Sequence, residues 1–143
     1  MSTITSAKPG IRSNMIKRNK VIYWIATIWL ALGVLSAGIV QLMGLNAEVE
    51  MMLHLGYPSY LLVILGASKL LSIVAILVPG FPVLKEWSYA GLFFTMAGAM
   101  MSHLMLGDSF GEIYQSMLLL ILTIVSWYFR PENRKPLINK RKF

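Results

Sequence analysis

The residue best placed to do chemistry is Lys69, which lies near the middle of a long apolar run. An ionisable side chain at that depth in a membrane is costly, and such residues usually face the interior of a helix bundle. On a helix, its neighbours Gly66 and Ser72 are small, so another helix can approach the same face. We expect Lys69 to point inward, either as a packing residue or as part of a binding site. The carboxylates nearest to it in depth are Asp108 and Glu112.

A second group of polar residues gathers around two loops on one side of the apolar runs. Its members are two histidines and four carboxylates: His54, His103, Glu48, Glu50, Asp108 and Glu112. Imidazole and carboxylate groups together can relay protons, receive the polar end of a ligand or bind a divalent metal. Neither histidine belongs to an H-x-x-x-H or E-x-x-H pattern, so we predict no metal site. Ordinary interface residues are the alternative, and we expect Lys69 to couple to this group through Glu112 or His103.

A third group, Lys85, Glu86, Trp87 and Tyr89, stands where a short loop meets the third apolar run. Glu86 in the first turn of a helix suits the positive end of the helix dipole. We expect Lys85 to reach anionic lipid headgroups, and Trp87 and Tyr89 to mark the membrane interface. These roles are structural, and we predict no catalytic residue.

Four apolar runs must position these side chains. They cover residues 21–42, 60–78, 87–106 and 110–129. Each is long enough to cross about 30 Å of hydrocarbon as a helix. The 143-residue chain is 57% hydrophobic and 13% charged, which departs from the average for soluble domains. The sequence predicts an all-α integral membrane four-helix bundle over residues 21–130, with basic tails at 1–20 and 131–143 that are disordered or lie on the lipid surface.

The charges indicate how the runs are oriented. Apart from Lys69, every lysine and arginine lies before the first run, between the second and third, or after the fourth. The other two loops hold acidic residues instead. The positive-inside rule therefore places both termini and the central loop in the cytoplasm, in a multi-pass protein of the inner (plasma) membrane. The net charge of +7 follows from this topology and does not indicate a nucleic-acid partner.

Several kinds of chemistry are excluded by the residues that the chain lacks. It has no cysteine, which removes disulfides, thiolate metal sites and dithiol redox chemistry. It also shows no phosphate-binding glycine loop and no motif for haem, flavin or iron–sulfur clusters. We predict no cofactor of its own; a redox role would need a borrowed cofactor or a quinone.

Four short motifs resemble a known family. They are H-L-G-Y-P at 54–58, G-x-x-K at 66–69, P-x-L-K-E-W-x-Y-A-G at 82–91 and the pair Ser102-His103. In combination they are specific, although each alone is weak. From about Trp24 to Pro131, the chain resembles the DoxX-like family of small bacterial four-helix membrane proteins.

The resemblance implies a fold and a membrane location more firmly than an activity. The family takes its name from a small subunit associated with a quinone-linked oxidoreductase. Similar four-helix proteins in animals bind sterols or assist receptor assembly, and most bacterial members have no assigned reaction. The positions that match the family motifs are His54, Lys69, Glu86, Trp87, Tyr89 and His103.

We therefore expect an accessory, non-enzymatic membrane protein with a polar site around Lys69 and His103. This site would hold a small lipophilic ligand, or dock a membrane-protein partner or a second copy of the chain. The alternative is the membrane subunit of a quinone-linked oxidoreductase, in which the same side chains bind quinone carbonyls and move protons. A small transporter or channel is a third alternative, which four short runs without an internal repeat support less well.

Overall fold

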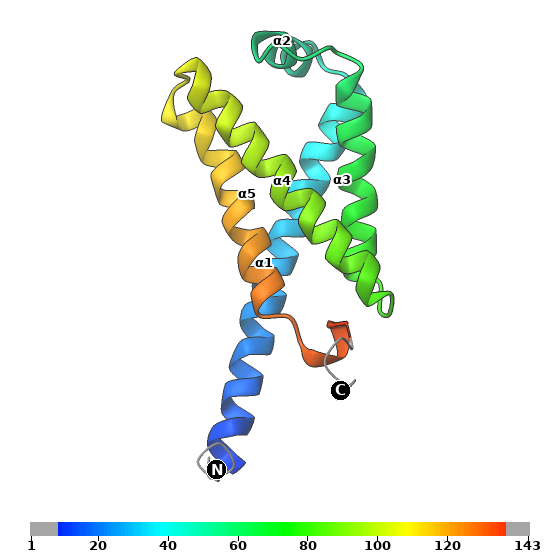
Figure 1. Ribbon diagram of the computed structural model, residues 1–143, viewed down its shortest axis with the longest axis vertical. Helices are drawn as coiled ribbons and strands as arrows, with labels where there is room; N and C mark the ends of the chain where they lie inside the picture. Colours follow the sequence, from blue (N-terminus) through cyan, green and yellow to red (C-terminus); the bar gives the residue numbers. More distant parts are fainter. Residues whose placement is uncertain (1–8, 137–143) are drawn as a thin grey trace, which may run out of the picture.

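The computed structural model describes residues 9–136, and within this range every regular element is a helix (Figure 1). The elements are α1 (Pro9–Met43), α2 (Asn46–His54), α3 (Leu61–Leu77), α4 (Pro82–Leu106), α5 (Phe110–Tyr128) and the short 3-10 helix η1 (Glu132–Arg134). Helices α1, α4 and α5 are long and apolar enough to cross a membrane, whereas α3 is apolar but has 17 residues. The expected all-helical class is confirmed for the described residues.

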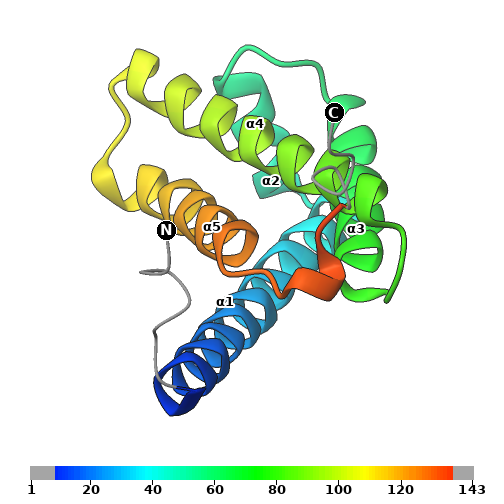
Figure 2. The ribbon, with the colours of Figure 1, turned by 60° about the horizontal axis from the view of Figure 1, so that its bottom comes forward.

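The four longer helices pack in two pairs, α1 with α3 and α4 with α5. Helix α1 also contacts α5, and α3 contacts α4. Figure 2 shows the molecule with its lower end turned forward. Around the molecule, the helices come in the order α1, α5, α4 and α3. The two pairs meet near the α3–α4 turn and η1, which we call the tail end. They diverge toward the end that carries α2 and the α4–α5 turn, which we call the α2 end (Figure 1).

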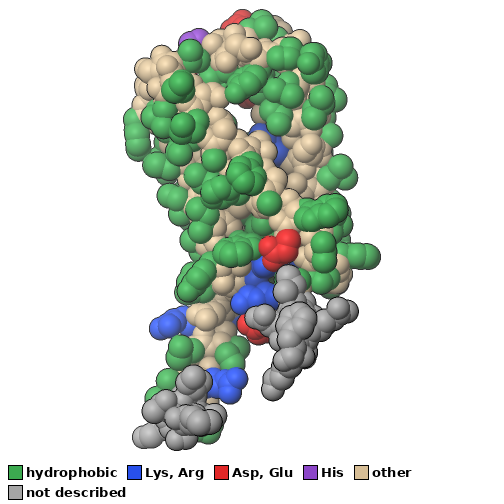
Figure 3. Space-filling view, in the orientation of Figure 1, with side chains coloured by type: hydrophobic (Ala, Val, Ile, Leu, Met, Phe, Trp, Pro, Cys, Tyr) green, Lys and Arg blue, Asp and Glu red, His purple; other side chains and the backbone are tan. Residues whose placement is uncertain are grey.

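Large apolar side chains cover the outside of the helices. Trp87 is 72% exposed and Met105 is 83% exposed, and apolar side chains spread over most of the face drawn in Figure 3. The buried core that links the helices is small by comparison. It contains Leu30, Val34, Ile73, Ile76, Tyr89, Leu92, Met96 and Leu119. An apolar exterior of this extent suits contact with lipid and not with water.

Helices α1 and α3 approach each other at backbone distance. A methyl group at Gly66 would lie 2.9 Å from the Gly38 carbonyl oxygen and 2.9 Å from Leu42 Cγ. Because neither glycine carries a side chain, the two helices lie closer than larger residues would allow. This close approach places Gln41 of α1 opposite Lys69 of α3.

The end of α3 is closed by two cationic side chains. Lys85 Nζ donates to the carbonyl oxygens of Ala75 at 2.7 Å and Ile76 at 2.9 Å, and also to that of Val78. Arg134 donates to the Ile76 oxygen at 3.1 Å. Carbonyls in the last turn of a helix lack partners within the helix, and cations are stabilised there. Lys85 is only 1% exposed, which corrects the expectation that it reaches lipid headgroups.

The chain outside the expected spans is more helical than the sequence suggested. Residues 9–20 form the first part of α1, where Pro9 occupies a position that tolerates proline. Adding turns to an existing helix is easier than starting one, so the apolar run extends into the polar segment. Helix α2 occupies a segment expected to be a loop, and η1 lies in the expected C-terminal tail. The remaining tail residues, 1–8 and 137–143, lie outside the described residues.

The close contact between α1 and α3 leads us to predict that a larger residue at Gly66 lowers the stability of the fold. Gly66→Ala should lower the melting temperature of the purified protein in detergent, because the added methyl group overlaps Gly38 and Leu42. Overpacking of this kind costs about 1–3 kcal/mol. Gly98→Ala is the matched control, since a methyl group at Gly98 would meet no atom within 4 Å. Equal melting temperatures for the two variants would contradict the close approach.

Candidate functional site

The divergence of the two helix pairs leaves a cavity at the α2 end. Its volume is about 560 Å³, within the range of small-molecule sites, and all five α-helices contribute to its wall. Figure 3 shows an opening in this part of the molecule, with basic side-chain atoms at its edge. The polar residues of the wall are Ser36, Gln41, Glu48, Tyr57, Lys69, Thr95, His103, Glu112, Gln115 and Ser116.

Lys69 faces this cavity from the middle of α3. Its side chain is buried, with 7% of the residue exposed, and Nζ donates to Gln41 Oε1 at 2.9 Å. Sequence reasoning placed the lysine in the interior but did not identify Gln41 as its partner. Within residues 9–136, Lys69 makes no ion pair with the expected partners Glu112 and His103. All three side chains nevertheless line the same cavity.

A carboxylate joins two imidazoles beside this cavity. Asp108 Oδ2 lies 2.8 Å from His103 Nδ1, and Asp108 Oδ1 lies 2.9 Å from His54 Nε2. Glu112 Oε2 lies 3.9 Å from the same nitrogen of His103. His103 is buried and lines the cavity, whereas the side chain of His54 is 55% exposed. The structure thus brings together His54, His103, Asp108 and Glu112, which the sequence placed on one side.

The ion pair between His54 and Asp108 changes the pKa of both residues. The hydrogen bond to Asp108 and the charge of its carboxylate raise the pKa of His54. Hydrogen bonds from His54 and His103 lower the pKa of Asp108. A hydrogen-bonded series of three ionisable groups therefore connects the cavity wall with solvent, and such a series can pass a proton.

Three of these groups also have the spacing of metal ligands. One ligand atom each from His103, Asp108 and Glu112 lies within 4.8 Å of the others. A divalent cation would compete with the hydrogen bonds that Asp108 already accepts from two imidazoles. The absence of a metal site stays a prediction.

Two residues of the third sequence group, Glu86 and Tyr89, make contacts that stabilise the fold at the tail end. Glu86 accepts hydrogen bonds from Arg130 and, at 3.0 Å, from Trp127 Nε1. Tyr89 is buried, and its hydroxyl lies 2.7 Å from Ser126 Oγ. These contacts join α4 to α5 and the residues just after it. Neither Glu86 nor Tyr89 lines the cavity at the α2 end.

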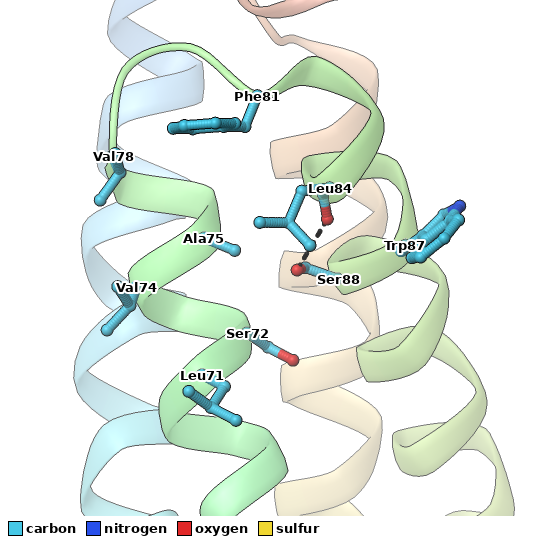
Figure 4. A pocket seen from close by; sticks show the side chains of 9 residues that line it. All are labelled: Leu71, Ser72, Val74, Ala75, Val78, Phe81, Leu84, Trp87 and Ser88. Atoms are coloured by element: carbon cyan, nitrogen blue, oxygen red, sulfur yellow. Dashed lines mark hydrogen bonds between the residues drawn. The ribbon is translucent and has the colours of Figure 1, made fainter.

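A second hollow lies between α3 and α4 near the tail end (Figure 4). Its volume is about 510 Å³, and its wall is mostly apolar, with Phe81 and Trp87 among the lining residues. One of its two serines, Ser88, donates to the Leu84 carbonyl oxygen of its own helix. No charged residue lines this hollow, so the groups able to do chemistry lie in the other cavity.

The apolar exterior and the long helices define a helical membrane protein. Residues 25–126 match the model of the DoxX-like family, and the chain belongs to this family. The matched range includes Gln41, Lys69, His103 and Asp108. A search of the curated proteins and a search of the solved structures gave no match.

The His54–Asp108 pair predicts a pH dependence of stability. The pKa of His54 is raised, so its contribution is complete below the ordinary histidine value of about 6.5 and is lost as the pH rises through the raised pKa. The pKa of Asp108 is lowered, so its contribution is present above the ordinary carboxyl value and is lost as the pH falls through the lowered pKa. The pair therefore stabilises most between these two ordinary values.

Melting temperatures of the wild type and of His54→Gln in detergent test this expectation. The wild type should exceed the variant most at about pH 5.5, and the difference should shrink toward about pH 9. Asp108→Asn should also remove the part of the pH dependence that comes from the His54–Asp108 pair. A difference between the wild type and His54→Gln that stays constant over this range would contradict the pairing.

Proposed function

We propose that this DoxX-like protein is an accessory membrane protein that holds a small lipophilic ligand in the cavity at the α2 end. The observation that carries the proposal is a partly open, mostly apolar cavity of about 560 Å³ with a buried lysine in its wall. Ligand sites commonly combine an apolar wall with a few placed polar groups. Lys69, Gln41 and His103 provide those groups here.

The apolar wall of the cavity suits a flexible or irregular ligand. Three methionines, Met51, Met52 and Met96, line it together with Phe94 and Leu119. Methionine side chains are unbranched and adapt to the shape of a bound molecule. The opening seen in Figure 3 would let a molecule enter from the surrounding membrane.

One observation supports a second candidate, the membrane subunit of a quinone-linked oxidoreductase. The series His103–Asp108–His54 runs from the cavity wall to an exposed imidazole, and reduction of a quinone requires protons. Lys69 and His103 would donate hydrogen bonds to the quinone carbonyls, and electrons would come from a partner protein. This candidate uses the same cavity, so the identity of the bound molecule separates the two.

We further propose that α1, α3, α4 and α5 each cross the inner (plasma) membrane, with both termini on the cytoplasmic side. The charges of the two ends support this orientation. Lysines and arginines of the described chain other than Lys69 lie toward the tail end or on α1 before it, and the residues between α1 and α3 and between α4 and α5 include none. Short loops rich in lysine and arginine stay on the cytoplasmic side.

Single cysteines test the orientation cleanly, because the chain has no cysteine of its own. Ser13→Cys, Ala47→Cys and Ser109→Cys all replace exposed residues. A membrane-impermeant maleimide applied to intact cells should label the cysteines at 47 and 109 but not the one at 13. All three should react after the cells are opened. Labelling at position 13 in intact cells would overturn the proposed topology.

Co-purification tests the proposed ligand. The protein is extracted in mild detergent, and the bound lipids and quinones are identified by mass spectrometry. Ala99→Trp, which fills the cavity, should reduce a specifically bound molecule by about ten-fold or more relative to the wild type. Leu71→Trp, in the hollow of Figure 4, is the matched control and should retain it.

The identity of the retained molecule decides between the two candidates. A quinone that disappears in Ala99→Trp supports the oxidoreductase subunit, and another lipophilic molecule with the same behaviour supports the accessory protein. Identical contents in the wild type, Ala99→Trp and Leu71→Trp would contradict a ligand in this cavity.

A further inference from the structure

We infer that the cavity selects a neutral amphiphile whose polar end is a hydrogen-bond acceptor, such as a ketone, ester or ether oxygen, and that Lys69 is the donor that recognises it. This inference rests on the proposed function and names the chemical class of its ligand.

Lys69 brings more hydrogen-bond donors to the cavity wall than the described residues satisfy. A lysine ammonium carries three N–H groups, and among residues 9–136 Gln41 Oε1 is the acceptor within hydrogen-bond distance of Lys69 Nζ. The helix carbonyls around Lys69 are used within α3. Buried donors without acceptors are unfavourable, so the remaining N–H groups favour an acceptor inside the cavity.

Gln41 adds to this donor-rich surface. Its amide oxygen accepts from Lys69, which leaves the amide nitrogen with its two N–H groups at the cavity wall. Both residues are buried between α1 and α3, where the glycine contact holds them. The polar end of a ligand beside Lys69 and Gln41 must therefore accept hydrogen bonds.

The charges of the wall disfavour two other kinds of polar end. Glu48 and Glu112 also line the cavity, so a carboxylate such as that of a fatty acid would meet two negative charges beside the one positive charge of Lys69. A cationic end would meet Lys69 itself. A neutral acceptor avoids both repulsions and still satisfies the free N–H groups.

The test uses three probes with the same number of carbon atoms: methyl pentadecyl ketone, heptadecane and heptadecanoate. Each is added to delipidated protein in detergent micelles, and the amount retained after gel filtration is measured by mass spectrometry. The ketone should bind about ten-fold more tightly than heptadecane and heptadecanoate, as expected for one hydrogen bond to a charged donor. Ala99→Trp should retain none of the three.

Two variants assign the selectivity to the proposed donors. Lys69→Met nearly keeps the length of the side chain and removes the ammonium donor. Its preference for the ketone should disappear. Gln41→Glu, which pairs the ammonium and removes the amide donors, should reduce the same preference and provides the test if Lys69→Met does not fold.

The measurements distinguish a failure of the inference from a failure of the proposed function. Equal retention of the ketone and heptadecane by the wild type would overturn the inference, while the loss of both in Ala99→Trp would keep the proposed function. Tightest binding of heptadecanoate would overturn the selection of a neutral end. Equal retention of every probe by the wild type and Ala99→Trp would overturn the inference and the proposed function together.

Discussion

The backbone contact between Gly38 and Gly66 is the constraint on which the candidate site depends. It brings α1 and α3 so close that a single methyl group would overlap the facing helix. The same approach brings Lys69 Nζ within 2.9 Å of Gln41 Oε1, and both residues are buried. In hydrocarbon there is no water to satisfy a lysine, so small residues at a helix crossing are what make a buried cation tolerable.

The two ends of the molecule differ in how their helices are joined. At the tail end, Tyr89, Ser126 and Thr27 join three helices through hydrogen bonds of 2.7 Å, and Glu86 and Arg130 add an ion pair. At the α2 end the helix pairs separate, and contacts between side chains bridge the gap. Among these are His54 with Asp108 and Tyr57 with Ser102. Because the helices are tightly joined at the tail end, the molecule can keep a cavity at the α2 end.

The sequence predicted the parts of the fold that follow from hydrophobicity and charge. It placed the apolar helices, the inward Lys69 and the side shared by His54, His103 and Asp108. It did not predict Gln41 as a partner or Lys85 as a cap, because both depend on which helices touch, and one sequence does not specify a pairing of helices. The start of α1 at Pro9 was also missed, since polar composition at residues 9–20 says little about whether a neighbouring helix continues.

The cap on α3 has a consequence for the surrounding bilayer. With 17 residues, α3 is about 26 Å long, which is shorter than the hydrocarbon thickness of about 30 Å. In the proposed topology, Lys85 and Arg134 hold polar groups where this short helix stops, so the bilayer beside the α3–α4 turn must become thinner. Because α3 forms one wall of the cavity, hydrophobic mismatch would bear directly on the separation of the helix pairs. In the proposed topology, a change in membrane thickness would therefore act on the width of the cavity.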